Sequence, residues 1–188
     1  MSNQLDRDKA LALVYEYTIS ESLRKHMLAV EKSMLWYARY FNLSPDEQLK
    51  WGIVGLLHDF DYESHPDPLP PDGHPFWGCA LLKKLGYEEE IITAILGHAS
   101  YTGTPRNSLM AKALFAVDEL SGFLVACSLV RPDRSIMNLK AESVVKKMKD
   151  KAFAKGCSRE EMKSGAAELG IELNAHIENL ITALSDFQ

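Results

Sequence analysis

The sequence predicts an all-α protein in which several helices pack into one globular bundle. In most segments apolar residues recur every three or four positions, the period of a helix that buries one face. Alternation of single apolar and polar residues, which a half-buried strand requires, is nearly absent. The 188 residues are 46% hydrophobic and 25% charged, as in ordinary globular proteins. We therefore expect a single domain over 1–188, with its functional core at about 20–125 and a helical extension at about 140–188.

The first two helices are predicted from apolar spacing, and the third from the residues at its start. Apolar residues indicate a short helix over 5–17 and a longer one over 21–41. Ser44 can cap a third helix, Pro45 suits its first position, and Glu47 completes a capping box. This third helix is expected to run through an apolar stretch toward a His-Asp pair.

Proline, aspartate and glycine separate the elements in the middle of the chain. The predicted order is a loop at 60–75, helices at 75–85 and 88–98, a loop at 100–107, and a long apolar helix from Leu109 through Leu124. Gly86 separates the two shorter helices, because glycine readily adopts the left-handed conformation that ends a helix. Arg131-Pro132-Asp133 ends the segment of the long helix.

The C-terminal third is predicted to be helical as well, at roughly 141–155, 159–169 and 172–186. Ser158 and Glu161 form a second capping box. The last segment carries an apolar stripe formed by Ile171, Leu173, Ile177, Leu180, Ile181 and Leu184. We interpret this stripe as core rather than as an interface, although the C-terminal helices could support a homodimer.

The charge balance gives no strong nucleic-acid signal. The net charge is −5, so the protein as a whole does not present the basic surface that neutralises phosphates. One basic cluster occurs, at Lys146–Lys151, and Lys155 and Arg159 follow it. Such a run is typical of a solvated helix face, but one of its residues could turn into a pocket and meet a phosphate.

Cysteine usage and hydropathy suggest a cytoplasmic protein without a membrane partner. Cys79, Cys127 and Cys157 are widely separated, which argues against a disulfide framework and fits a reducing compartment. No apolar run approaches the ~20 residues that cross a bilayer. The N-terminus lacks the apolar core of a signal peptide.

Histidines at breaks in the helical pattern are the first candidates for chemistry. His26 lies in the second helix, and His58 is followed at once by Asp59. His74 opens one predicted helix and His98 closes another. Imidazole and carboxylate donors without a nearby cysteine suit zinc, manganese, iron, cobalt or nickel. The two remaining histidines, His65 in the loop and His176 in the last helix, are expected not to be ligands.

Asp118 is the most informative single residue, because it stands inside the apolar run Leu114–Leu120. Burying a carboxylate is expensive unless a cation or hydrogen-bond donors receive it. Taken one at a time, these residues have simpler explanations. A histidine near a helix end can be a cap or a dipole partner, and an aspartate in an apolar helix can be an internal hydrogen-bond acceptor.

The order His26, then His58-Asp59, then Asp118 on a helical chain resembles the HD-domain phosphohydrolase superfamily. That family is named for the adjacent His-Asp pair, and the preceding Gly-Leu-Leu is a close match. The resemblance covers about 20–125 and implies the all-helical HD-domain, phosphodiesterase-like fold. It also implies that the four residues ligate one metal ion.

The resemblance implies a second ion as well. In HD proteins with two metals, further histidines lie between the His-Asp pair and the last aspartate, where His74 and His98 stand here. Asp59 would then bridge two ions. The expected cofactor is one or two divalent transition-metal ions (Mn, Fe, Co, Ni or Zn).

The implied activity is that of a metal-dependent phosphomonoesterase or phosphodiesterase. A metal-activated water would attack a small phosphorylated molecule, with a nucleotide as the leading candidate. His58 and Asp59 would carry the catalysis. Asp61 or Glu63 could help to move a proton, but we interpret both as residues of a solvated loop. Cationic side chains that could bind the phosphate are Arg106, Lys112, Arg131 and Lys149.

Two departures narrow the family, and two alternatives stay open. Phe60-Asp61-Tyr62 follows the His-Asp pair, without the lysine or the Gly-Tyr-Pro motif of cyclic di-GMP phosphodiesterases, and no module of the alarmone hydrolases is present. The same six ligands would also fit an HD-type di-iron oxygenase acting on a small polyol or a phosphonate. The third possibility is a non-catalytic regulatory protein that contains a metal, because a fold does not determine a reaction.

Overall fold

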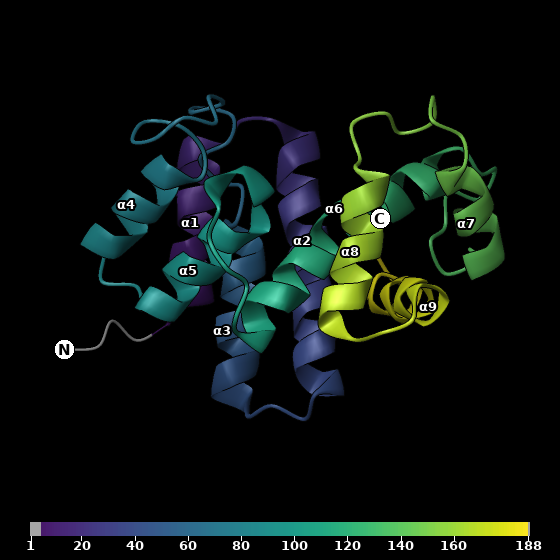
Figure 1. The fold of residues 1–188 in the computed structure, drawn as a ribbon, viewed down its shortest axis with the longest axis horizontal. Helices are drawn as coiled ribbons and strands as arrows, with labels where there is room; N and C mark the ends of the chain where they lie inside the picture. The colour runs from purple at the N-terminus through teal and green to yellow at the C-terminus, as the bar shows by residue number, and fades with distance from the viewer. Residues whose placement is uncertain (1–4, 188) are drawn as a thin grey trace. The chain divides into compact units, whose positions relative to one another are not determined.

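The computed structural model describes residues 5–187 and is all-helical. Over these residues it contains nine α-helices, one 3₁₀ helix and no strand (Figure 1). The chain divides into two compact units, which meet between Leu114 and Phe115. That boundary lies inside a single helix, α6 (Leu109–Leu129), so no linker separates the units. The prediction of one domain over the whole chain stays a prediction.

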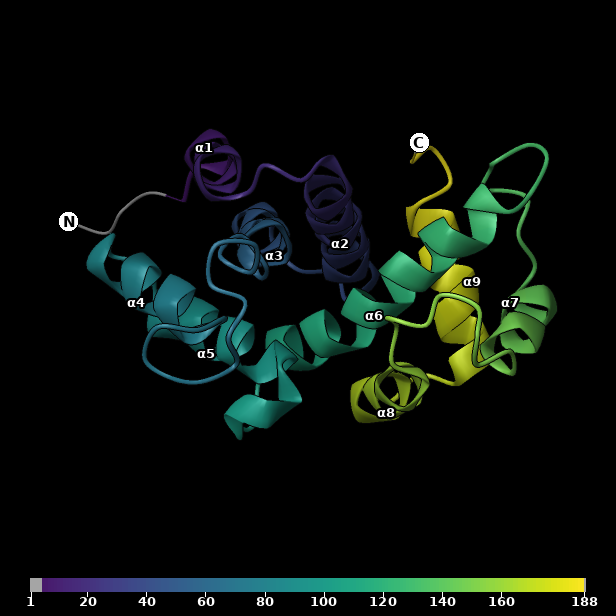
Figure 2. The same ribbon diagram turned by 90° about the horizontal axis from the view of Figure 1, so that it is seen from above.

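The first unit is built around three helices, α1 (Arg7–Tyr17), α2 (Glu21–Tyr40) and α3 (Pro45–Leu57). Figure 2 shows α3 beside both α1 and α2, and α3 packs on each of them. The predicted bounds are confirmed to within two residues. Ser44 accepts a hydrogen bond from the backbone N–H of Glu47 at 3.3 Å and caps α3 as expected.

Gly55 allows α2 and α3 to pack closely. A Cβ atom at this position would lie 2.9 Å from the Cα of Glu31 and 2.9 Å from the carbonyl oxygen of Val30. Any larger residue at this point of α3 would therefore force the backbones of the two helices to shift. The close packing matters for the site, because α2 carries His26 and α3 leads directly into His58.

The first unit also contains two shorter helices, α4 (Phe76–Lys84) and α5 (Glu89–His98), which pack against each other. The glycine predicted to separate them, Gly86, has a φ of 84° and its N–H bonds to the carbonyl of Lys83. The predicted loop at 100–107 contains a short 3₁₀ helix, η1 (Ser100–Thr102).

The second unit contains the rest of α6 with α7 (Ala141–Met148), α8 (Arg159–Leu169) and α9 (Leu173–Ala183). Helix α9 packs on α7 and α8. A Cβ at Gly165 of α8 would lie 2.6 Å from the Cα of Ala116, so this glycine permits close packing of α8 on α6. The apolar stripe of the last helix serves the core, since Ile177, Leu180 and Leu184 are fully buried.

One helix prediction was wrong at its end. The helix predicted over 141–155 stops at Met148. The side chain of Asp150 accepts hydrogen bonds from the N–H groups of Ala152 and Phe153, which gives the backbone an alternative to the helical pattern. Arg159 donates hydrogen bonds to backbone carbonyls of the segment after Met148. These contacts join residues up to nine positions apart, so helical periodicity cannot reveal them.

Candidate metal centre

Five of the predicted ligands belong to the first unit and come from four different segments. His26 lies on α2, and His58 and Asp59 follow directly on the end of α3. His74 lies in the loop before α4, and His98 is the last residue of α5. His58, His74 and His98 are buried, and the Asp59 side chain is 16% exposed. Segments far apart in the sequence therefore converge on one carboxylate.

Asp59 presents one oxygen to each of two histidine pairs. Its Oδ2 lies 3.5 Å from Nε2 of His58 and 3.8 Å from Nε2 of His26. Its Oδ1 lies 3.3 Å from Nε2 of His74 and 3.4 Å from Nε2 of His98. A carboxylate placed in this way can serve two ions, one on each oxygen.

Three of the histidines are oriented by a hydrogen bond at Nδ1, the ring nitrogen that faces away from Asp59. In two of them the acceptor is a backbone carbonyl. Nδ1 of His58 lies 2.8 Å from the carbonyl oxygen of Gly55, and Nδ1 of His98 contacts the carbonyl oxygen of Ile95. A carbonyl can only accept, so Nδ1 carries the hydrogen in both rings. In the neutral ring Nε2 then holds a lone pair, which is the form in which histidine ligates a metal.

His74 is oriented by a second carboxylate, that of Asp61. Nδ1 of His74 donates to Oδ1 of Asp61 at 2.8 Å, and the N–H of Gly78 donates to Oδ2 at 2.7 Å. Asp61 is 1% exposed, so both of its oxygens are satisfied away from solvent. A Cβ at Gly78 would lie 2.7 Å from the Asp61 carboxyl group, which explains the glycine at that position. The prediction that Asp61 belongs to a solvated loop was wrong.

The spacing of the donor atoms fits metal ions. Nε2 of His74 lies 3.3 Å from Nε2 of His98, and Nε2 of His26 lies 3.2 Å from Nε2 of His58. Two nitrogens that bind the same ion, each at about 2.1 Å, are about 3.0 Å apart when the angle between the two bonds is a right angle. They are about 3.4 Å apart when that angle is tetrahedral. His74 and His98 both donate from Nδ1, so in their neutral forms the lone pairs of their Nε2 atoms face each other and repel unless a cation lies between them. The donor atoms of Asp59, His74 and His98 together form a group that could hold an ion.

Aromatic side chains support His74 from two sides, and the sequence reasoning missed them. Tyr101 of η1 donates its hydroxyl to the His74 carbonyl oxygen at 2.8 Å. The ring of Tyr62 meets the His74 ring edge-on, with centroids 5.2 Å apart. Burial and the nearby carboxylates of Asp59 and Asp61 raise the pKa of Tyr101 to about 12. Neither tyrosine belongs to a motif, so only the position of Tyr62 close to the His-Asp pair could have drawn attention to it.

The remaining residues near the His-Asp pair have structural roles. Glu63 is exposed, and its carboxylate accepts the N–H groups of Ile19 and Ser20, which lie just before α2. His65 stacks on Trp77 with ring centroids 4.0 Å apart and bonds through Nδ1 to the Asp72 carbonyl. These contacts place Glu63 and His65 in the framework of the loop.

The other predicted site residues divide between the two units. Arg106 belongs to the first unit and donates from Nη1 to the carbonyl oxygen of Gly97 at 2.9 Å, beside His98. Lys112 lies in the first turn of α6.

In the second unit, Arg131 forms a two-pronged ion pair with Asp133 at 2.9 and 3.0 Å, and Lys149 follows α7 and is exposed. Asp118 lies on α6, four residues beyond Leu114, the last residue of the first unit.

His176 belongs to the core of the second unit. It is fully buried and its Nε2–H donates to the carbonyl oxygen of Ala116 at 2.9 Å. Burial lowers the pKa of His176 to about 4, so the ring is neutral near pH 7. It fills a core position, as expected for a histidine outside the ligand set.

Comparison with known proteins identifies the family. The family model described as HD domain matches residues 23–122, more than half of the chain, and this range includes all six predicted ligands. No curated protein and no solved structure matches the chain. None of the helices within residues 5–187 combines the length and apolar character needed to cross a membrane. HD domains bind divalent metal ions and are mostly metal-dependent hydrolases. The chain belongs to the HD-domain family.

Proposed function

We propose that this protein is a metal-dependent phosphohydrolase that acts on a small phosphorylated molecule, with nucleotides as the leading substrate class. The observation that carries the proposal is the two-sided Asp59 carboxylate between His26 and His58 on one oxygen and His74 and His98 on the other. Two ions held on either side of one carboxylate are suited to a phosphoryl group, whose oxygens need more than one positive contact.

By analogy with other HD domains, the first ion would be held by His26, His58 and Asp118, two imidazoles and one carboxylate. The second would be held by His74 and His98, and Asp59 would contribute to both. Divalent Mn, Fe, Co, Ni or Zn all accept these donors. When bound, such ions lower the pKa of water toward neutrality and offset negative charge on phosphate.

The protein groups around the centre have defined tasks in this proposal. His58 and Asp59 would hold the ions, and they are the residues whose loss should abolish turnover. Asp61 and Glu63 are already hydrogen-bonded through their carboxylates, so we assign them to positioning rather than to the handling of the water proton. Arg106, held at the end of α5 beside His98, is our choice for a phosphate contact.

The state of the three cysteines supports our inference that the protein is cytoplasmic. Cys79, Cys127 and Cys157 are all unpaired in the structure. Burial raises the pKa of Cys127 and of Cys157 to about 11, so neither is a ready nucleophile. We propose a cytoplasmic enzyme, in which thiols of this kind stay reduced.

Metal content and turnover, measured on the same preparations, test the proposal. Wild-type protein, Asp118→Ala, Asp59→Asn and a control variant of the exposed loop, Asp72→Asn, would be purified without chelator and analysed for metals. We expect about two ions per chain in the wild type and the control, and fewer in both site variants. Phosphate release from a nucleotide panel should require the ions and fall at least about 100-fold in Asp59→Asn.

The possible results separate the three functions. Iron with oxygen consumption in the presence of a polyol or phosphonate would replace hydrolysis by the oxygenase reaction. Bound metal that stabilises the protein without any turnover would favour a regulatory protein. Wild-type protein that takes up no metal even after divalent ions are added would refute the metal centre itself.

A further inference from the structure

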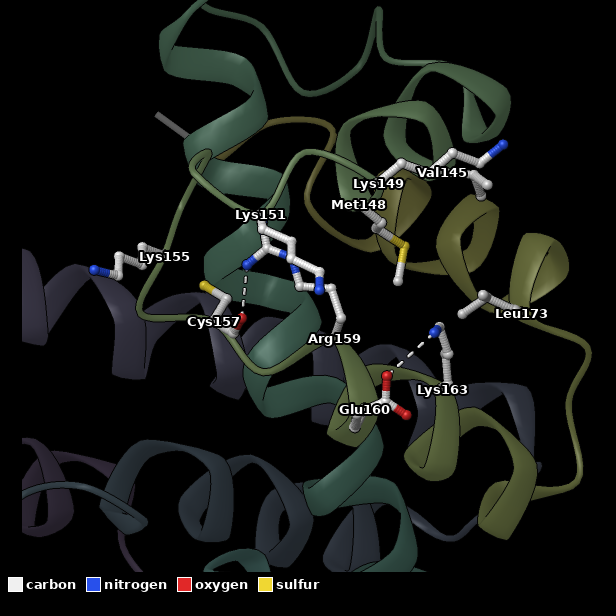
Figure 3. Close-up of a pocket in the computed structure, with 10 residues that line it drawn as sticks. All are labelled: Val145, Met148, Lys149, Lys151, Lys155, Cys157, Arg159, Glu160, Lys163 and Leu173. Carbon is white, nitrogen blue, oxygen red and sulfur yellow. Dashed lines mark hydrogen bonds and ion pairs between the residues drawn. The ribbon is translucent and has the colours of Figure 1, made fainter.

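The second unit contains a pocket of about 640 Å³ that the proposed hydrolysis does not use (Figure 3). Its walls come from α7, the segment after α7, the first turns of α8 and the first residue of α9. Every residue that lines it lies between Val145 and Leu173, so the pocket belongs to this unit alone. Its volume falls in the range of pockets that bind small molecules.

Five of the ten residues that line the pocket are cationic. Lys149, Lys151, Lys155, Arg159 and Lys163 border the pocket, and the only acidic residue that lines it is Glu160. Glu160 pairs with Lys163 at 3.3 Å. Among residues 5–187, no carboxylate lies within ion-pair distance of the other three lysines or of Arg159. The chain carries a net charge of −5, so this concentration of positive charge is a local feature.

Arg159 builds one wall of the pocket. Its guanidinium donates to the carbonyl oxygens of Ala154 and Cys157 at 2.7 Å each, of Asp150 at 3.1 Å, and of Phe153. These bonds hold the segment after α7 in place, including Lys151 and Lys155. Carbonyl groups solvate the guanidinium but do not cancel its charge, so Arg159 adds to the positive potential of the pocket.

Apolar side chains line the pocket as well. Val145, Met148 and Leu173 lie there together with the cations. In the view of Figure 3, Leu173 lies beside Lys163, and Lys151 and Cys157 lie across the pocket from them. A ligand that contacted both kinds of side chain would carry an anionic part and an apolar or aromatic part.

We propose that this pocket binds a small organic polyanion, of the size and chemistry of a nucleoside diphosphate. Lys151, Lys163 and Arg159 would attract its phosphates, and Met148 and Leu173 would contact its base. A pocket of limited volume with an apolar side suits such a ligand better than an extended nucleic acid, which would need a basic surface beyond the pocket. None of the six predicted metal ligands lines this pocket, and the proposal does not rest on the proposed hydrolysis.

The test is equilibrium binding of three probes, ADP, pyrophosphate and adenosine, to the full-length protein by calorimetry at low salt, after divalent ions have been removed with EDTA and the EDTA has been dialysed away. Because the divalent ions are removed, metal-dependent binding at the metal centre does not contribute. We expect saturable binding of ADP and pyrophosphate, weaker binding of adenosine, and a loss of affinity as the salt concentration rises.

Matched variants test both the direction and the size of the expected changes in ADP affinity. Lys151→Gln with Lys163→Gln should weaken ADP binding about tenfold, and the exposed control Lys140→Gln should not. Glu160→Gln should tighten binding about two- to fivefold, because it removes the acidic residue, whereas Glu142→Gln on α7 should have no effect. Leu173→Ala should weaken ADP but leave pyrophosphate unchanged. Thermal melting would verify that each variant is folded.

Three results would overturn the proposal. They are the absence of saturable binding of ADP and pyrophosphate at millimolar concentration, equal affinity in the double lysine variant and the wild type, and tighter binding of a single-stranded RNA oligomer than of ADP. The last result would assign the basic pocket to nucleic acid.

Discussion

Two aspartates separated by one residue have opposite roles at the centre. Asp59 faces the Nε2 atoms of four histidines, where ions would be bound. Asp61 faces Nδ1 of His74 and the Gly78 N–H, where it can only orient its neighbours. The carboxylate of Asp61 therefore acts on the metal through His74, by fixing the ring and increasing the basicity of its Nε2.

Replacing Asp61 by Asn tests this positioning role. The amide can still accept from His74, but its NH₂ group then meets the Gly78 N–H, so one donor is left without an acceptor. We expect metal affinity to fall about 10–100-fold, with one of two ions lost first. Competition with a chromophoric chelator measures this affinity, and the exposed Asp72→Asn serves as control. If Asp61→Asn destabilises the fold but binds both ions with wild-type affinity, Asp61 has only a structural role.

At the scale of elements, the approach of α2 and α3 sets the distance between His26 and His58. Gly55 makes this approach possible, and its carbonyl oxygen also accepts a hydrogen bond from Nδ1 of His58. One residue of α3 thus determines both helix packing and ring orientation. The 3.2 Å between the two Nε2 atoms depends on helices that meet without a side chain between them.

Gly55→Ala should therefore lower both stability and metal affinity. Alanine normally favours a helix by about 1 kcal/mol over glycine. Here its Cβ would lie 2.9 Å from the backbone of α2, and such overpacking costs about 1–3 kcal/mol because backbone cannot move aside easily. We expect a lower urea midpoint and weaker metal binding. Gly156→Ala, where nothing lies within 4 Å of the new Cβ, is the matched control and should match the wild type.

At the scale of the whole molecule, stability should depend on the protonation of His176. Its pKa is lowered by burial to about 4 from an ordinary value near 6.5. Between these values the unfolded chain binds a proton at His176 and the folded chain does not. The contribution of His176 to the free energy of unfolding is therefore fully present above pH 6.5 and is lost as the pH decreases toward 4, by up to about 3 kcal/mol.

His176→Gln isolates this contribution. Glutamine can keep a hydrogen bond to the Ala116 carbonyl but does not titrate. Urea unfolding at several pH values between 7 and 4, with EDTA present, should show a shallower loss of stability in the variant than in the wild type. Titration of the histidines at the metal centre is common to both proteins and cancels in the comparison. Parallel pH profiles would show that His176 does not set the acid sensitivity.

The sequence by itself determined most of the helices and the family, and it suggested the metal donors. Helical periodicity and the caps at Ser44 and Ser158 are local properties, so they predict elements within a few residues. The chemistry of His58-Asp59 within an apolar context is local in the same sense. These signals arise from neighbours in the chain, which is why one sequence was sufficient to suggest an HD domain.

Only the tertiary structure decided which residues support the donors and how the donors face one another. From the sequence, Asp61 is predicted to be an ordinary loop residue. The structure shows that His74, thirteen positions later, donates a hydrogen bond to it. The end of α7 at Met148 depends on Asp150 and on Arg159, which binds the chain from beyond the segment. The two-sided position of Asp59 requires α2, α3, α5 and a loop to meet. Contacts between distant segments follow from packing, and packing depends on the whole fold rather than on local sequence.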